Sequence, residues 1–135
     1  MEPILSEPPT TFHSNTRVNN QKAGRIGIES QAATFFGYQS GNANLITGTN
    51  NTGFGSKALY SNTSGGENTA TGTSALYANI DGIRNTANGS CALISNTSGG
   101  NNTAIGAVAL LDNTTGSYNT AVGESALKSN TQRMV

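Results

Sequence analysis

Residues 51–67 read NTGFGSKALYSNTSGGE, and residues 68–84, which follow directly, read NTATGTSALYANIDGIR. Aligned without a gap, the two stretches share the pattern Asn-Thr-x-x-Gly-x-x-Ala-Leu-Tyr-x-Asn. Related units begin at Asn85, Asn102 and Asn119, so five copies of one 17-residue unit follow one another. A strict period of this length is typical of repeat proteins, in which each unit packs only on its neighbours.

Four columns of the repeat, meaning the same position in successive units, are nearly invariant. The Leu column and the Ala column before it are expected to point into the core of the stack. The two Gly columns are expected at corners, where the chain needs a positive φ or a close approach of backbones. The members are Leu59, Leu76, Leu93, Leu110 and Leu127; Ala58, Ala75, Ala92, Ala109 and Ala126; Gly55, Gly72, Gly89, Gly106 and Gly123; and Gly65, Gly82, Gly99 and Gly116.

The column before the first Gly is mixed, because it holds Phe54, Thr71, Asn88, Ile105 and Val122. A position that accepts both Asn and Ile is predicted to face solvent or a partner chain rather than the inside of a narrow coil. The candidates from this column for contact with another chain or a receptor are Phe54, Ile105 and Val122. Tyr60 and Tyr77, which share another column, are further candidates.

The repeat is predicted to form β-structure, because Gly, Asn and Thr have poor helix propensity and no helical apolar stripe is present. Short β-prone segments between Gly and Asn-Thr pairs fit coils with tight turns. Coils stacked about 4.8 Å apart would place identical residues above one another. The columns Asn51 to Asn119 and Asn62 to Asn130 would then hydrogen-bond from neighbour to neighbour. The predicted fold class is all-β, a parallel β-solenoid of 17-residue coils.

The chain is expected to divide into an extended N-terminal arm (1–23), degenerate capping coils (24–50) and five solenoid repeats (51–135). The stretch Ala33–Asn50 is one residue longer than the repeat and lacks the Ala-Leu pair, as suits an atypical terminal unit. The fragment Arg25–Ser30 is interpreted as a further degenerate coil.

Composition argues against several classes of protein. The formal net charge is zero and no basic block is present to neutralise phosphates, so nucleic-acid binding is not expected. No stretch approaches the ~18 apolar residues of a membrane span, and the first ten residues lack the apolar run of a secretory signal. With 34% hydrophobic residues, each coil has a thin core, and self-association is expected to supplement it.

No residue is assigned a catalytic role, and the chain is not expected to be an enzyme. His13, the only histidine, lies in the arm, away from partners for a catalytic triad or a zinc site. Cys91 is the only cysteine, which excludes an internal disulfide, and it lies in a variable column without a neighbouring base or motif of a reactive thiol.

No metal or cofactor is expected either. Asp81 and Asp112 occupy different columns, whereas calcium-binding repeats need an acidic residue in nearly every coil. The pairs Gly65-Gly66 and Gly99-Gly100 lack the Lys-Ser/Thr ending of a phosphate-binding loop and are predicted to be turns.

Two further patterns arise from the repeated Asn-Thr. Asn62, Asn96 and Asn113 begin glycosylation sequons, which are interpreted as by-products of the repeat. A regular outward Thr column could match an ice lattice or a polysaccharide, although only Thr69-Ala70-Thr71 offers a pair of Thr on one strand. The column comprises Thr52, Thr69, Thr86, Thr103 and Thr120.

The unit Asn-Thr-Ala-x-Gly-x-x-Ala-Leu-x-x-Asn-Thr-x-Gly resembles the head repeats of trimeric autotransporter adhesins of the YadA type. It is also similar to Asn-Thr-Ala-x-Gly repeats of phage tail-fibre and large-virus surface proteins. The resemblance covers residues 24–135 and implies a left-handed β-roll, a homotrimer and binding to host surfaces. The period is longer than in those adhesin heads, and the neck, stalk, membrane barrel and secretion signal of a whole autotransporter are missing.

These features predict a non-enzymatic structural and attachment protein, a trimeric segment of a viral or phage fibre, spike or capsid projection on the virion surface. Its expected partners are further copies of itself, other virion proteins bound through the arm, and a host receptor or glycan. Two alternatives stay open: the head of a bacterial trimeric adhesin on the cell surface, and a monomeric solenoid that binds ice or glycan.

Overall fold

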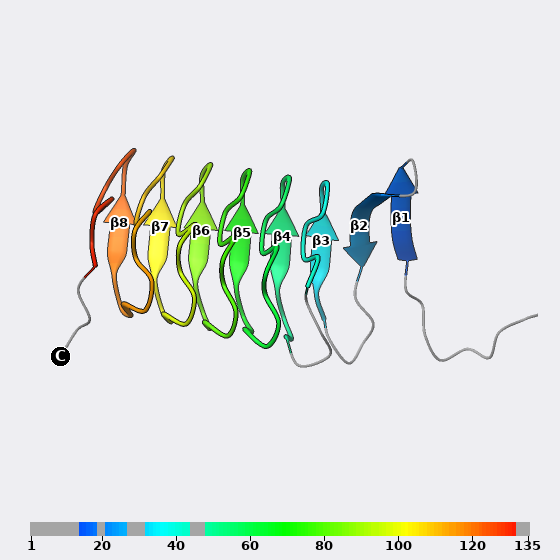
Figure 1. Cartoon of the computed structure of the whole chain (residues 1–135), viewed down its shortest axis with the longest axis horizontal. Coiled ribbons are helices and arrows are strands. Elements are labelled where there is room, and N and C mark those ends of the chain that lie inside the picture. The colour runs from blue at the N-terminus through cyan, green and yellow to red at the C-terminus, as the bar shows by residue number, and fades with distance from the viewer. Residues whose placement is uncertain (1–13, 19–20, 27–31, 44–47, 132–135) are drawn as a thin grey trace, which may run out of the picture.

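The computed structural model describes residues 14–18, 21–26, 32–43 and 48–131. They contain one eight-stranded sheet in which each strand lies next to the strand that follows it in sequence (Figure 1). The strands are β1 (Ser14–Val18), β2 (Gln21–Ile26), β3 (Thr34–Phe36), β4 (Thr52–Phe54), β5 (Thr69–Thr71), β6 (Thr86–Asn88), β7 (Thr103–Ile105) and β8 (Thr120–Val122).

Strands β3 to β8 are parallel, and each contributes one rung to a stack of coils. Thr52 pairs with Thr69, and every later step along this column is again 17 residues. The first step, from Thr34 to Thr52, is 18 residues, which accounts for the longer first unit. Figure 1 shows the rest of each coil looping from one strand to the next. The prediction of a parallel β-solenoid with 17-residue coils is confirmed.

Only three residues of each coil are strand, yet the turns are also joined to their neighbours by main-chain hydrogen bonds. The Leu59 amide donates to the Ala75 carbonyl at 3.0 Å, and the Gly72 amide donates to the Phe54 carbonyl at 2.8 Å. Equivalent bonds recur in the following coils. Because buried main-chain groups need partners, this pattern holds coils together even where no sheet is formed.

The core is a narrow column of Leu and Ala side chains. Leu59, Leu76, Leu93 and Leu110 are fully buried, as predicted. Leu127 is 51% exposed, so the prediction of an inward position is wrong for this member of the column. The reason is its place in the last coil, because no further coil lies over it in the described part of the chain.

Different residues fill the core of the first coil. Gly41 stands at the position of the Leu column, since its amide donates to the Ala58 carbonyl as the Leu59 amide does to Ala75. Phe35 is buried beside it, and a Cβ placed on Gly41 would lie 2.5 Å from the Phe35 ring. The Phe side chain therefore occupies the space that Leu fills in later coils.

The two Gly columns are required for different reasons. Gly55 and its equivalents have positive φ angles, 135° at Gly55, as predicted for corners. The Gly65 column is required by space, because a Cβ on Gly65 would lie 2.4 Å from Asn62 Oδ1 and 2.5 Å from the Gly82 carbonyl oxygen. Positive φ is not confined to Gly, since the Leu column also adopts it, with 51° at Leu59.

An antiparallel hairpin stands at the N-terminal end of the stack. β1 pairs antiparallel with β2, and β2 pairs antiparallel with β3, which covers an edge that would otherwise be open. Arg25 and Ile26, interpreted from the sequence as part of a coil, belong to β2 and lie outside the parallel register. The hairpin crosses the predicted boundary at residue 23. Residues 1–13 lie outside the described residues, so the division into arm and capping coils stays a prediction.

Candidate functional site

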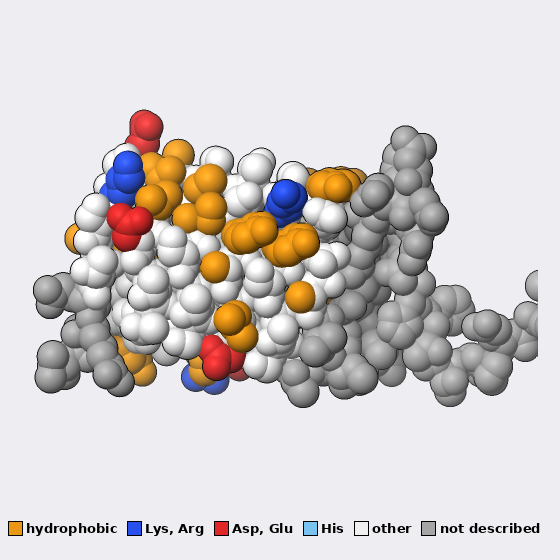
Figure 2. All heavy atoms as spheres, viewed as in Figure 1, with side chains coloured by type: hydrophobic (Ala, Val, Ile, Leu, Met, Phe, Trp, Pro, Cys, Tyr) orange, Lys and Arg blue, Asp and Glu red, His pale blue; other side chains and the backbone are white. Residues whose placement is uncertain are grey.

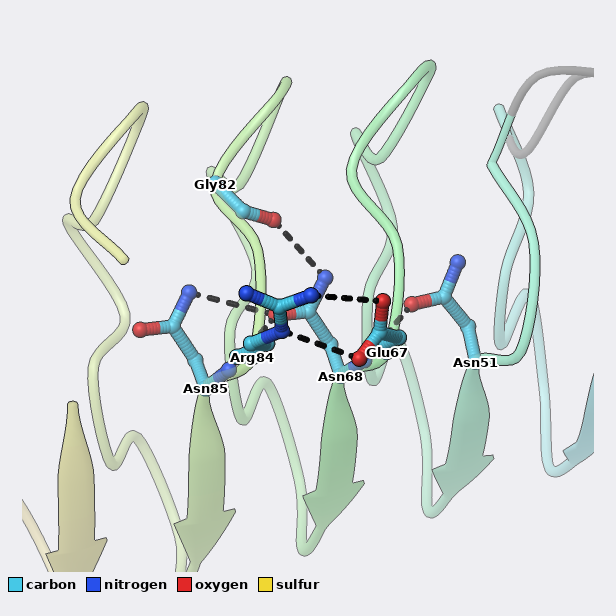
Figure 3. A network of polar contacts seen from close by, with 6 residues as sticks. All are labelled: Asn51, Glu67, Asn68, Gly82, Arg84 and Asn85. Carbon is cyan, nitrogen blue, oxygen red and sulfur yellow. Dashed lines mark hydrogen bonds and ion pairs between the residues drawn. The ribbon is translucent and has the colours of Figure 1, made fainter. Parts of the chain in front are cut away.

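The first Asn column forms a buried ladder along the stack (Figure 3). Asn68 Nδ2 donates to the Gly82 carbonyl at 2.8 Å, and Asn68 Oδ1 accepts from Asn85 Nδ2 at 3.1 Å. The main-chain amide of Asn85 also donates to Asn68 Oδ1, at 2.9 Å. Asn102 and Asn119 continue the same pattern. Each amide thus fixes its own coil and the coil on either side.

The second Asn column forms a parallel ladder. Asn79 Nδ2 donates to Asn62 Oδ1 at 2.7 Å, Asn96 Nδ2 to Asn79 Oδ1 at 2.8 Å, and Asn113 Nδ2 to Asn96 Oδ1 at 3.0 Å. The prediction of Asn bonded neighbour to neighbour is confirmed for these residues. The ladder stops at Asn113, whose buried Oδ1 has no donor among the described residues, so the predicted bond from Asn130 is not formed.

The sequon asparagines are members of this second ladder. Asn62, Asn96 and Asn113 are fully buried, and their Nδ2 groups are hydrogen-bonded. A glycan on these nitrogens would remove a donor from the core and could not fit between coils. Their role in the folded chain is structural, which supports the interpretation of the sequons as by-products of the repeat.

One ion pair bridges two coils on the surface. Arg84 Nε donates to Glu67 Oε2 at 3.0 Å, and Arg84 Nη2 donates to Glu67 Oε1 at 3.3 Å (Figure 3). The hydrogen bond from Arg84, followed by its charge, lowers the pKa of the Glu67 carboxyl. This pair was not predicted from the sequence. The signal was available, because opposite charges one period apart must lie on adjacent coils.

The residues considered for chemistry from the sequence are not brought together. Cys91 is half-buried, with φ 57°, and accepts a long hydrogen bond of 3.8 Å from Ser90 Oγ. Asp81 is exposed and Asp112 half-buried, in different columns. His13 lies outside the described residues. In the part of the chain that the structure describes, no three His, Cys, Asp or Glu side chains are grouped closely enough to hold a metal ion.

The Gly pairs considered as phosphate-binding loops lie in turns between coils. Gly65 offers its carbonyl oxygen to Asn51 Nδ2 at 2.7 Å and to Asn62 Nδ2 at 2.9 Å. The corresponding Gly99 carbonyl accepts from Asn85 and Asn96. These glycines close each coil on the two Asn ladders, which agrees with the prediction of turns.

The residues predicted to face solvent or a partner do lie on the surface. Phe54, Ile105 and Val122 are exposed, and the Phe54 ring stacks on Phe36 of the first coil with centroids 5.4 Å apart. Figure 2 shows a face on which a row of hydrophobic side chains crosses the coils beside charged ones.

A second stacked aromatic pair and the Thr column also lie on the surface of the coils. Tyr60 and Tyr77 are half-buried and stack with centroids 5.0 Å apart and 5° between the ring planes. The Thr column lies on the strands and also points outward, with Thr103 less exposed than the others. The described coils therefore offer columns of surface side chains that recur from coil to coil.

No family model, no curated protein and no solved structure matches this chain. Among the described residues there is also no helix of the length and apolar character needed to cross a membrane.

Proposed function

We propose that this chain is a non-enzymatic structural and attachment protein, a trimeric segment of a viral or phage fibre, spike or capsid projection. The observation that carries the proposal is the exposed hydrophobic side chains repeated along one column of a hydrogen-bonded stack. In the proposed assembly the coils wind left-handed and three chains lie side by side, as the resemblance to adhesin heads and fibre repeats implies.

The mechanism follows from stiffness and repetition. Main-chain bonds and two Asn ladders join each coil to the next, and six strands at about 4.8 Å spacing span roughly 24 Å from β3 to β8. A trimer presents each surface column three times on a rigid support. Once one copy has bound a receptor or glycan, the other copies are held at a high effective concentration near further receptors. Several weak contacts then give tight binding of the whole trimer.

Mass measurement tests the proposal directly. Multi-angle light scattering of the purified chain at micromolar concentration should give a mass three times 13.8 kDa. A binding assay on immobilised host-cell glycans should show that the trimer binds much more tightly than a monomeric variant. A stable monomer at that concentration would rule out both the virion fibre and the bacterial adhesin head, which needs the same trimer.

The N-terminal residues are proposed to attach the stack to other virion proteins. Removing residues 1–13 leaves the β1–β2 hairpin and every coil intact. The shortened chain should keep its β-sheet circular dichroism but fail to enter particles. Normal incorporation of the shortened chain would show that the attachment site lies elsewhere.

A monomeric ice- or glycan-binding solenoid is the second candidate, and the outward Thr column is the observation that favours it. The adjacent surface column works against it, because Phe54, Asn88 and Ile105 do not make a regular second row. Thermal hysteresis of ice growth in a monomeric sample would support this candidate. Its absence together with a trimeric mass would favour the fibre.

A further inference from the structure

The outward side of β3 to β8, here called the strand face, differs in composition from the rest of the surface. It consists of two side-chain columns: Thr34, Thr52, Thr69, Thr86, Thr103 and Thr120; and Phe36, Phe54, Thr71, Asn88, Ile105 and Val122. None of these side chains is charged. Every charged side chain of the described coils lies elsewhere: Lys57, Glu67, Asp81, Arg84, Asp112, Glu124 and Lys128.

The strand face also carries the largest group of exposed hydrophobic side chains that share a column. Phe36, Phe54, Ile105 and Val122 are 41–67% exposed. By contrast, Ile80 and Ile83 lie on the same coil as Asp81 and Arg84, and the face in Figure 2 mixes hydrophobic and charged groups. Depletion of charged residues is a feature of the buried centre of a protein interface. On the strand face the four hydrophobic side chains stand among seven Thr and one Asn, none of them charged.

The spacing of the ladders indicates what covers this face. Side chains of one column recur once per coil, at about 4.8 Å, and only a surface of the same pitch can interdigitate with them along the whole stack. A second copy of the chain has that pitch and the same number of rungs. Thr71 and Asn88, between two hydrophobic pairs, would then meet polar residues of the other copy.

The strand face alone is smaller than a standard interface, so the contact must also include the columns beside it. Six strands at about 4.8 Å, each with three residues at about 3.3 Å, give roughly 250 Å², against about 800 Å² per partner in a standard interface. In the column beside the face, Ser56, Thr73, Ser90 and Ala107 are small and neutral and extend the contact over the four central coils, whereas Tyr38 and Glu124 stand at the two ends of that column. A ring in which each chain touches two others uses both sides of the face.

We infer that the strand face is the surface on which copies of this chain pack together, with their axes parallel and their coils in register. This inference rests on the proposed trimer. The inference names the residues through which two copies of the chain touch. The columns outside this contact, among them that of Tyr60 and Tyr77, are then free to bind a receptor.

Lysine substitutions test the face against a matched control. Ile105→Lys with Val122→Lys places charges on the strand face, and Ile80→Lys with Ile83→Lys places the same number on another exposed part of the coils. All four side chains are exposed, so circular dichroism should stay unchanged. The strand-face variant should need at least a tenfold higher concentration to assemble, whereas the control should assemble as the unmodified chain does.

Site-specific cross-linking tests the register. The native cysteine is first removed by Cys91→Ser, a change that the stack accepts because Ser74 and Ser125 hold the equivalent positions. With Ile105→Cys as the single cysteine, a short bismaleimide should then link position 105 of one chain to position 105 of another. An antiparallel pair would instead join Phe54→Cys to Ile105→Cys, because these positions are second from opposite ends of the column.

The outcomes separate the inference from the proposed function. If the unmodified chain is a monomer, the proposed trimer fails and this inference with it. If the chain is oligomeric but the strand-face lysines leave assembly unchanged, or the cross-link joins positions 54 and 105, only the inference is overturned. A self-cross-link at position 105 and loss of assembly in the strand-face variant alone would establish it.

Discussion

Replacing Asn96 by Ala removes one rung from the middle of the second Asn ladder. The substitution deletes the bonds from Asn96 Nδ2 to Asn79 Oδ1 at 2.8 Å and to the Gly99 carbonyl at 3.0 Å, and it leaves Asn113 Nδ2 without the Asn96 acceptor at 3.0 Å. A buried polar atom left without its partner costs about 1–3 kcal/mol. Asn113 Nδ2 keeps its bond to Gly116, and the Gly99 carbonyl keeps its bond from Asn85. Asn79 Oδ1 alone loses its donor, so the expected loss in the free energy of unfolding is about 1–3 kcal/mol.

Urea unfolding followed by circular dichroism, at one fixed protein concentration, measures this loss. The control is Asn88→Ala, which removes an exposed Asn at the end of β6, directly before the corner residue Gly89 of the same coil. This change should alter stability by less than about 0.5 kcal/mol. The same change at Asn119, a half-buried end rung, should cost less than at Asn96. If Asn96→Ala costs no more than Asn88→Ala, the ladders do not stabilise the stack.

Three other perturbations have clear expected outcomes. Gly72 has φ 130°, and a Cβ added there by Gly72→Ala would lie 2.6 Å from a carbonyl oxygen of the next coil, so the thermal midpoint should fall strongly. Gly66→Ala, whose Cβ would lie 3.2 Å from the nearest atom, should have a small effect. Leu93→Ala should lower the unfolding free energy by about 2–5 kcal/mol, and Leu127→Ala, half-exposed, by much less; equal losses would contradict the burial of the column. The pKa of Glu67 is lower in the folded chain than in the unfolded chain. The contribution of its ion pair to the free energy of unfolding should therefore be fully present above the ordinary carboxyl pKa and be lost as pH falls through the folded pKa. Glu67→Gln should remove that part of the dependence of the thermal midpoint on pH, and an unchanged curve would contradict the assignment.

The repeat made the stack, its period and its inner column predictable, because identical residues 17 apart must meet when coils lie on one another. Leu59 could be placed in the core and Asn79 in a hydrogen-bonded column on this ground, whereas the complete burial of Asn79 was not predicted. The packing of Phe35 over Gly41 could not be predicted, because only the first coil has a large side chain at one of these positions and none at the other.

Backbone conformation was the least predictable feature. The sequence suggests that Gly supplies all positive φ angles, but Leu59, Lys57 and Val108 adopt them too, which isolated residues of these types avoid. The inter-coil bonds impose this conformation, for instance between the Lys57 amide and the Tyr38 carbonyl at 2.8 Å. The N-terminal hairpin was missed because it lies before the first unit, where no second copy exists for comparison.

Both Asn ladders run in one direction, because each Nδ2 donates to the Oδ1 of the preceding coil. Aligned amides polarise one another, and their dipoles sum along the solenoid axis as peptide dipoles do in a helix. The carbonyl ends point toward the C-terminal side, where Asn113 Oδ1 has no donor among the described residues. The two ladders therefore give the solenoid axis a direction, and each added coil lengthens both rows of aligned amide dipoles.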